Sequence, residues 1–204
     1  MKMNHDFDTF SEFYKIGRKP WDTGQVCPEL LGALDAGKLP GKTVLELGCG
    51  TGTNAFEFAR RGYAVRAVDF VPQAVEMARE KARAEAAAVT GSLDFRVADV
   101  LKDDLGGPYD VLFDRGVYHS LRHLDLKRFQ EVLEKITRKG TRWLTLAGNA
   151  KETLEGHNPP RVSEKEFRAE LGGLFDFIDI HEFLLETDKP DFRPLAWAIL
   201  MERK

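Results

Sequence analysis

The feature that most constrains this chain is an apolar run that ends in a glycine-rich turn and is followed by an aspartate. Residues 44–52 read VLELGCGTG, and Asp69 closes the next apolar run. The β-branched Thr43 and Val44 are typical of a buried parallel strand. The glycines allow backbone angles and a close ligand approach that a Cβ would prevent. The pattern predicts a strand, a tight turn and an acid placed, about 20 residues on, to bind the hydroxyls of a ribose.

The form of the glycine turn narrows the class of nucleoside cofactor. A helix is expected over residues 55–61, opened by Thr53 and Asn54, with its N-terminal amides facing the same crevice. A dinucleotide fingerprint requires glycine at its sixth position, where the helix packs beneath a pyrophosphate, and this chain has Thr53 there. An NAD-dependent reductase is therefore disfavoured. The alternative is that the strand, turn and helix are purely structural and bind no ligand.

Length and composition indicate one domain and a small-molecule partner. The 204 residues, 43% of them hydrophobic, can bury a full core but leave no room for a separate substrate domain. A net charge of −3 provides no general attraction to nucleic acid. We see no apolar stretch of transmembrane length and no signal core at the N-terminus, and the two cysteines suit a reducing compartment, so we expect a cytoplasmic protein without a membrane partner.

Apolar runs and turn signals alternate along the rest of the chain, as in a doubly wound α/β fold. Pro72 suits the first turn of a helix that we expect to reach about Ala88, and Ser163 with Glu166 predicts a capping box for another helix. A further helix is expected over residues 126–136. Strands are expected at residues 64–69, 93–97, 111–114, 142–147, 175–185 and 195–201. The last two strands have no helix between them, which predicts a mostly parallel seven-stranded sheet with an antiparallel C-terminal edge hairpin.

The glycines at alternate positions after Glu46 resemble the first motif of class I S-adenosylmethionine methyltransferases. The cofactor of that family has no phosphate to bind, and the leading acid lies near its methionine part. The resemblance implies a Rossmann-like core over residues 42–204 and S-adenosylmethionine as the cofactor. It also implies that Glu46, Gly48, Gly50 and Asp69 bind this cofactor.

Asp99, at the end of the third expected strand, matches the position where this superfamily holds the adenine amino group. The resemblance places the backbone amide of Val100 beside it as a second adenine contact. The alternative for Asp99 is a solvated loop carboxylate, because aspartate is common in turns.

Three further stretches resemble particular members of the superfamily. Residues 19–24 (KPWDTG) and 28–30 (PEL) are similar to the segment ahead of the core in plant thiocyanate and halide methyltransferases. Residues 113–116 (FDRG) and 156–160 (GHNPP) are similar to the fourth-strand motif and a later loop of thiopurine S-methyltransferase. The similarity implies membership of this thiopurine, thiocyanate and halide methyltransferase group.

Within this resemblance, two residues are candidates for closing the cofactor site. Trp21 is expected to lie against the cofactor and, within an N-terminal helical lid over residues 1–36, to help exclude water during transfer. Its alternative role is to pack a loop onto the core. Arg115 is expected to contact the cofactor carboxylate or an anionic substrate. Its alternative is an ion pair with a structural acid such as Asp114 or Asp22.

Candidates for the reaction itself follow the fourth expected strand. Tyr118 and His119 lie where class I methyltransferases usually present substrate-facing side chains. His119 is a candidate catalytic base, and Tyr14 a candidate orienting hydroxyl. Because methyl transfer is an in-line displacement that positioning alone can accelerate, a purely structural His119 stays open. Arg161 departs from the thiopurine pattern and is a candidate substrate contact or else an exposed charge before a helix cap.

Our hypothesis is methyl transfer from S-adenosylmethionine to a small soft nucleophile, namely a thiol or another sulfur, selenium or tellurium species. O-methylation of a phenolic or quinolone-like hydroxyl is the alternative within enzymes, and a non-catalytic cofactor-binding sensor is the alternative outside them. No metal is expected, because His119 and His123 have helical spacing but no obvious third ligand. The oligomeric state is not predicted.

Overall fold

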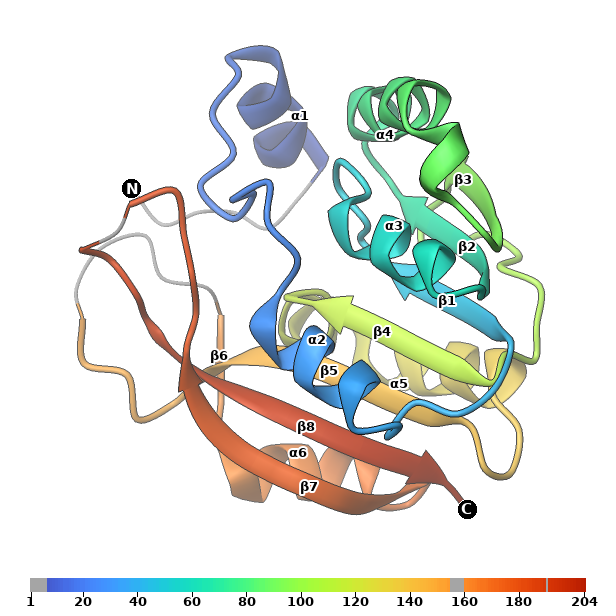
Figure 1. Cartoon of the computed structure of the whole chain (residues 1–204). Helices are drawn as coiled ribbons and strands as arrows, with labels where there is room; N and C mark the ends of the chain where they lie inside the picture. The colour runs from blue at the N-terminus through green and yellow to red at the C-terminus, as the bar shows by residue number, and fades with distance from the viewer. Residues whose placement is uncertain (1–6, 155–159, 190) are drawn as a thin grey trace.

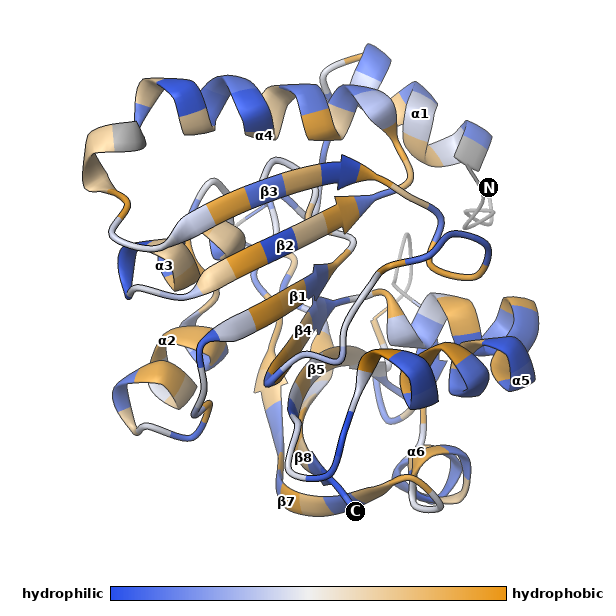
Figure 2. Cartoon of the chain, turned by 90° about the vertical axis from the view of Figure 1, so that its right-hand side faces the viewer, coloured by the Kyte–Doolittle hydropathy of each residue, from blue (hydrophilic) through white to orange (hydrophobic). Residues whose placement is uncertain are grey.

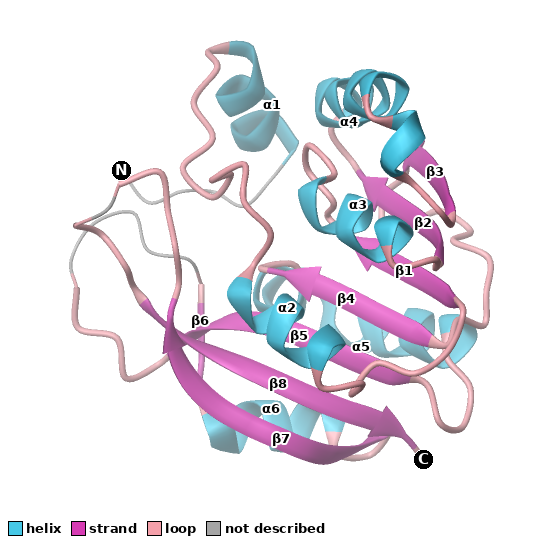
Figure 3. Ribbon diagram, in the orientation of Figure 1, coloured by secondary structure: helices cyan, strands magenta, loops and turns pink. Residues whose placement is uncertain are grey.

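In the computed structural model, which describes residues 7–154, 160–189 and 191–204, helices cover both faces of one mixed sheet (Figures 1 and 3). The helices are α1 (Phe7–Lys15), α2 (Pro28–Asp35), α3 (Thr53–Arg60), α4 (Pro72–Ala84), the 3-10 turn η1 (Ala86–Ala88), α5 (Tyr118–Ile136) and α6 (Glu164–Leu171). The strands are β1 (Thr43–Leu47), β2 (Ala64–Asp69), β3 (Ser92–Val97), β4 (Val111–Arg115), β5 (Arg142–Asn149), β6 (Arg161–Val162), β7 (Phe175–Leu184) and β8 (Leu195–Arg203).

The strand order confirms the doubly wound fold. The main path runs β3-β2-β1-β4-β5-β8-β7, with β3 to β5 parallel and β8 and β7 antiparallel. The chain moves outward from β1 to β3 and then returns to β4 on the other side of β1. This reversal creates a crevice at the carboxyl ends of β1 and β4, where ligands bind in such sheets. The short β6, which pairs with the end of β5, was not predicted because two residues carry no periodic signal.

Apolar side chains of the strands supply two cores, one on each face of the sheet. Figure 2 shows α2 and α3 on one face of the sheet and α5 and α6 on the other. Leu45 and Leu112 pack with residues of α5 and α6, whereas Val44 and Phe113 pack with residues of α2, α3 and α4. Consecutive apolar residues, whose side chains point to opposite faces of a strand, are what a sheet buried on both faces requires. No helix in the described part of the chain is both long and apolar enough to cross a membrane.

Several elements differ in length from the sequence prediction. Helix α4 ends at Ala84 instead of near Ala88, and its last residues form the separate turn η1. Helix α5 begins eight residues earlier than expected, at Tyr118, and contains a non-helical residue at Asp125 (φ −159°, ψ 85°). The early start depends on Asp114, whose Oδ1 accepts hydrogen bonds from the amides of Val117 and Tyr118, both at 3.0 Å. The capping box of Ser163 and Glu166 at α6 is confirmed.

The N-terminal segment has two structurally different parts. Helix α2 belongs to the core, because Leu30 and Ala33 are buried with residues of β1 and α3. Helix α1 instead lies beyond the carboxyl edge of the sheet, beside the start of α4 (Figure 1). Of the expected 1–36 lid, residues 7–27 are therefore the described part that is placed to cover the crevice.

Candidate active site

A cavity of about 1000 Å³ lies over the carboxyl ends of the parallel strands. Its floor comes from the loops that follow β1, β2, β3 and β4 and from the end of β5. Its walls come from α1, the first turns of α5 and the loop between β7 and β8. Most of the lining side chains are apolar or aromatic, among them Phe10, Phe70, Val117, Leu121 and Phe192. The cavity is large enough for a nucleoside cofactor and a second molecule of similar size.

Asp69 and Gly50 meet at this cavity, as the spacing in the sequence predicts. The Gly50 amide donates to Asp69 Oδ2 at 2.9 Å, and the Val71 amide donates to Oδ1 at 2.9 Å. Gly50 has a left-handed φ of 54°, and a Cβ there would lie 3.1 Å from the Tyr14 hydroxyl oxygen. Burial raises the pKa of Asp69 to about 6. The turn and the acid thus form one rigid unit that faces the cavity.

Asp99 and Val100 also line the cavity. Asp99 Oδ1 accepts from the Leu101 amide at 2.9 Å, and Oδ2 pairs with Lys102 at 2.7 Å. Among the hydrogen bonds of the described residues, none uses the Val100 amide. The backbone N–H of this buried residue is therefore a donor without an acceptor among the described residues, as an adenine contact would require.

Glu46 lines a second, smaller cavity of about 210 Å³ that shares Gly48, Gly50, Trp21 and Arg115 with the first. Its side chain is buried, and its Oε2 has no hydrogen-bond partner in the described structure. Burial raises the pKa of Glu46 to about 8. Gly48 is required for close packing here, since a Cβ would lie 2.4 Å from Val117 Cγ2. A buried carboxyl oxygen without a hydrogen-bond donor is costly unless a ligand satisfies it.

Trp21 and Arg115 lie between the two cavities and line both. The Arg115 guanidinium donates to the carbonyl oxygens of Trp21 at 2.5 Å and Glu186 at 2.6 Å. It takes part in no ion pair among the described residues, so the pairing with Asp114 or Asp22 that we considered is not observed. Arg115 instead joins the segment before α2 to the loop after β7. The Asp188 amide adds a third link by donating to the carbonyl of Pro20 at 3.0 Å.

Tyr14 packs with Trp21 in the wall of the cavity, with ring centroids 6.1 Å apart. Its side chain is buried, and burial together with the nearby Asp69 raises its pKa above the ordinary range. The hydroxyl therefore stays protonated, and it lies close to the glycine turn at Gly50. Its role in orienting an acceptor stays a prediction.

His119 lines the cavity and is almost fully buried, with 4% of its surface exposed. Its Nδ1 accepts a hydrogen bond from the Gly148 amide on β5 at 2.9 Å. Because β5 is a central strand, this bond fixes the ring at the end of the sheet. The position in the cavity agrees with the expected place for a residue that contacts the acceptor.

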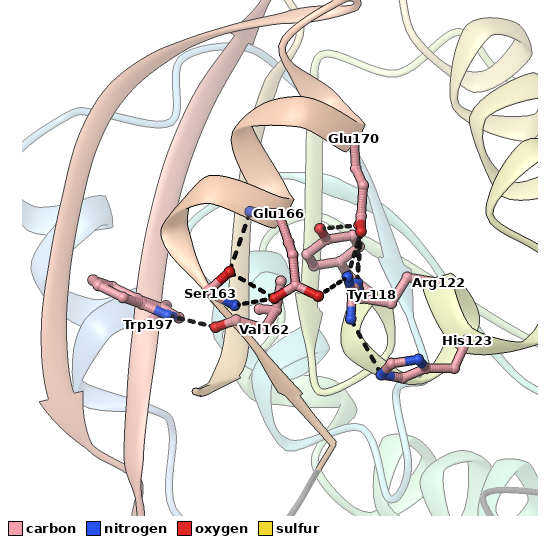
Figure 4. Close-up of polar contacts among 8 residues, drawn as sticks. All are labelled: Tyr118, Arg122, His123, Val162, Ser163, Glu166, Glu170 and Trp197. Carbon is pink, nitrogen blue, oxygen red and sulfur yellow. Dashed lines mark hydrogen bonds and ion pairs between the residues drawn. The ribbon is translucent and has the colours of Figure 1, made fainter. Parts of the chain in front are cut away.

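Tyr118 does not reach the cavity, contrary to our expectation. Its ring is fully buried and its hydroxyl donates to Glu170 Oε2 on α6 at 2.6 Å (Figure 4). Arg122 binds the same carboxylate and also donates to Glu166 at 2.8 Å. Since α5 starts at Tyr118 itself, helical geometry turns neighbouring side chains by about 100°, so that His119 faces the cavity and Tyr118 the α6 side. Tyr118 joins two helices.

Arg161 is likewise absent from the cavity wall. Its guanidinium donates to the carbonyl oxygens of Glu152 at 2.6 Å and Leu154 at 3.0 Å. These bonds anchor the loop after β5 instead of presenting a charge to the substrate. Of the 156–160 segment that resembles thiopurine S-methyltransferase, residues 156–159 lie outside the described residues. The direction of the Arg161 side chain depends on these nearby carbonyl groups. The residue type alone does not predict that direction.

The loop between β7 and β8 is the part of the site that the sequence analysis missed. Leu185, Thr187, Phe192 and Pro194 line the cavity from this loop. The sequence predicted this loop only as the turn of an edge hairpin. Its length was the available signal, because hairpin loops usually have two to five residues and longer loops often carry function.

Comparison with known proteins agrees with this geometry. A family model described as "Methyltransferase domain" matches residues 44–140, from β1 through α5. The chain is 29% identical over 180 residues to the 2-heptyl-1-hydroxyquinolin-4(1H)-one methyltransferase of Mycobacteroides abscessus, covering 86% of this chain and 77% of that relative. It is 37% identical over 100 residues to the magnesium-protoporphyrin O-methyltransferase of Rhodobacter capsulatus, covering 48% and 42%. The chain is a class I S-adenosylmethionine-dependent methyltransferase.

Solved structures show the same methyltransferase fold. A structure from work on the conversion of a disulfide bond into a thioacetal group during echinomycin biosynthesis aligns with a TM-score of 0.83 at 24% identity, covering 98% of this chain and 92% of that one. Magnesium protoporphyrin IX methyltransferase from Synechocystis PCC 6803 with bound S-adenosylmethionine aligns with a TM-score of 0.63 at 18% identity, covering 100% and 87%.

Three observations indicate that the described residues of this methyltransferase can hold S-adenosylmethionine. The carboxylate of Asp69 faces the large cavity beside the glycine turn, where it can accept from ribose hydroxyls. The Val100 amide has no protein acceptor, and Glu46 Oε2 has no protein donor. These groups belong to the ends of three different strands or the loops that follow them, as binding across the crevice requires.

Proposed function

We propose that this methyltransferase transfers a methyl group to the hydroxyl oxygen of a small aromatic compound. The observation that carries the proposal is the large cavity with mainly apolar and aromatic walls. A flat, apolar acceptor buries its rings there, whereas a small soft nucleophile such as a simple thiol would leave much of the space unfilled. The relative that matches most of the chain is named for a hydroxyquinolone, and a second for O-methylation. Neither of these two relatives is named for the sulfur, selenium or tellurium acceptor that we first expected.

In this proposal the cofactor is held by residues of β1 and β2 and of the loop that follows β3. Asp69 binds the ribose hydroxyls, the Val100 amide and Asp99 bind the adenine, and Glu46 binds at the methionine end. When bound, S-adenosylmethionine supplies a methyl group on a positively charged sulfur, which is a good leaving group. Trp21 and Arg115 hold together the segment before α2 and the loop after β7, which form the cover of the site. This cover excludes water.

The lining of the large cavity also favours a particular orientation of the acceptor. Val117, Leu121 and Phe10 offer apolar contacts for its rings, and His119 adds a polar side chain to the same lining. The main contribution of the protein to catalysis is then positioning of the oxygen in line with the methyl group, an effect worth about 7 to 11 kcal/mol in favourable cases.

The test is a competition among acceptors with radiolabelled S-adenosylmethionine under one set of conditions. We expect methyl transfer to hydroxyquinolones and phenols, with the product identified as an O-methyl ether by mass spectrometry. Aromatic thiols of matched size serve as the control for shape. Faster transfer to the thiols would overturn the oxygen assignment, and cofactor binding without any transfer would favour the sensor alternative.

A further inference from the structure

The loop between β7 and β8 stands at one end of the large cavity. Strand β8 pairs with β5, and Gly148 near the end of β5 lies opposite Ala196 near the start of β8. The residues that precede β8 are therefore beside the carboxyl end of β5. Asp69 and Asp99, by contrast, lie at the end of β2 and after β3, which β1 and β4 separate from β5. The cavity thus has a cofactor end over β2 and β3 and a second end, beside this loop, that is left for the acceptor.

Phe192 presents an aromatic ring to this second end of the cavity. The side chain is partly buried, yet it belongs to none of the three hydrophobic clusters that the described residues form. Within the described part of the chain its ring meets no other ring, whereas Phe10 and Phe13 both meet Trp21 edge-on, with ring centroids 5.1 and 5.4 Å apart. An aromatic side chain that lines a cavity and stabilises no core has apolar surface left for a ligand.

The Thr187 hydroxyl closes the part of the loop that carries this ring. Its Oγ1 donates to the carbonyl oxygen of Phe192 at 2.7 Å and accepts from the Lys189 amide at 3.1 Å. The Phe192 amide donates in turn to the carbonyl oxygen of Lys189 at 3.0 Å. Threonine hydroxyls often bridge backbone groups of a turn in this way. Both backbone groups of Phe192 are therefore bonded inside the loop, and one side-chain hydroxyl holds its carbonyl.

The loop is also fixed to the body of the protein at its base. The Leu185 amide donates to the carbonyl oxygen of Pro194 at 2.8 Å, which joins the two arms of the loop. The buried carboxylate of Glu152, which follows β5, accepts from the Leu195 amide. Because the base is held at these two points, the bonds inside the loop determine where the Phe192 ring lies.

We propose that Phe192 forms a wall of the acceptor site that selects flat two-ring hydroxyl compounds, and that Thr187 is a positioning residue that acts through Phe192. This inference rests on the proposed O-methylation and names its acceptor class. A ring system that lies beside the end of β5 covers the Phe192 ring and removes both apolar surfaces from water. Because the free energy gained grows with the apolar area buried, two fused rings bind more tightly than one.

Equilibrium binding of 2-naphthol and phenol to the complex with S-adenosylhomocysteine tests this wall without turnover. Phe192→Ala should weaken 2-naphthol binding about tenfold and reduce the preference for 2-naphthol over phenol. Phe192→Leu, which keeps apolar bulk, should weaken it less. The Kd for S-adenosylhomocysteine and the Tm should equal those of the wild type. Ile178→Ala is the matched control, because this exposed β7 residue lines neither cavity. Equal 2-naphthol affinity in Phe192→Ala and the wild type would overturn the proposal.

The role of Thr187 is tested by separating KM from kcat. Thr187→Val removes the hydroxyl and keeps the shape of the side chain, so we expect the KM for 2-naphthol to rise about three- to tenfold, with kcat and cofactor affinity nearly unchanged. Hydrogen exchange at the Phe192 amide should become faster. Thr187→Ser, which retains the hydroxyl, should restore the KM. In the Phe192→Ala background, Thr187→Val should have no further effect. The same rise in both backgrounds, or no rescue by serine, would overturn the positioning role.

Failure of this inference differs from failure of the proposed function. If no hydroxyl compound is methylated, the proposed O-methylation fails, and the binding measurements still decide whether Phe192 holds a flat two-ring compound. If 2-naphthol is methylated but binds equally well to the wild type and to Phe192→Ala, the O-methylation stands and the wall fails.

Discussion

At the scale of single residues, Asp69 shows how one side chain serves both the fold and the site. Its two oxygens hold the glycine turn through Gly50 and the start of α4 through Val71. A carboxylate oxygen accepts more than one hydrogen bond, so Asp69 keeps acceptor capacity for a ribose. Its burial at the end of β2 explains why its pKa is raised to about 6.

Cofactor affinity should therefore depend on pH. Because the charged carboxylate accepts hydrogen bonds from ribose hydroxyls, we expect full affinity above about pH 6 and weaker binding as the pH falls through this value. Asp69→Asn should weaken binding at pH 7 by about 1.5 to 3 kcal/mol and flatten the pH dependence. Isothermal titration calorimetry between about pH 5 and pH 8 measures both effects. Equal affinities for the two proteins at pH 7 would contradict the assignment.

Glu46 should lower the stability of the folded protein while contributing to cofactor binding. Its folded pKa of about 8 lies above the ordinary 4.5, so its contribution to stability is fullest below about pH 4.5 and is lost as the pH rises toward 8. At pH 8, the free energy of unfolding of Glu46→Gln, measured by urea denaturation, should exceed that of the wild type by about 2 kcal/mol or more. At pH 5.5 this difference should be smaller. The same variant should bind the cofactor more weakly. A stability difference independent of pH would refute this account.

At the scale of elements, α5 is held by contacts on two sides. His119 bonds to β5, while Tyr118 and Arg122 bind Glu170 on α6, next to the Ser163–Glu166 cap (Figure 4). Trp197 of β8 donates to the carbonyl of Val162 at 2.9 Å and secures the strand that precedes this cap. The first turn of α5 is therefore fixed between the sheet and α6.

Removing the Tyr118 hydroxyl should affect stability and not acceptor binding. We expect Tyr118→Phe to lose about 1 to 2 kcal/mol of unfolding free energy, because the partly buried Glu170 loses one donor. Its KM for an acceptor should equal that of the wild type. Tyr109→Phe, which removes another buried hydroxyl that bonds to Leu105, is the matched control. A raised KM in the Tyr118 variant alone would return this residue to the substrate site.

The cover of the site should loosen when Arg115 is changed. Arg115→Met removes the bonds to the carbonyls of Trp21 and Glu186, so we expect about tenfold weaker cofactor binding and faster hydrogen exchange at the Asp188 amide. Arg18→Met is the control, because Arg18 also lines the cavity but its guanidinium makes no hydrogen bond to the described residues. Unchanged exchange in the Arg115 variant would contradict its linking role.

At the scale of the whole molecule, the cofactor should act as a stabilising ligand. It contacts loops from both halves of the sheet, so binding favours the native state over the unfolded chain. At about 100 times its Kd, S-adenosylmethionine should add about 2.7 kcal/mol, which corresponds to a rise in Tm of about 5 to 10 °C for a chain of this size. NAD at the same concentration is the control in differential scanning fluorimetry. A larger shift with NAD would revive the reductase alternative.

Local patterns in the sequence predicted the fold class, the first crossover unit and the position of Asp69 in the cavity. They succeeded because periodicity, glycine turns and capping boxes act over a few residues, as Gly50 and the Ser163–Glu166 cap show. Every strand of the main path was anticipated on this basis. The same local information identified the cofactor through its resemblance to a known motif.

Only the tertiary structure decided where side chains point and which loops meet over the site. Tyr118 and His119 are adjacent in sequence, yet one bonds to α6 and the other to β5 at the cavity, because the start of α5 depends on the buried Asp114. Arg115 bonds to backbone carbonyls that lie 94 and 71 residues away. Such directions depend on partners that are distant in the chain.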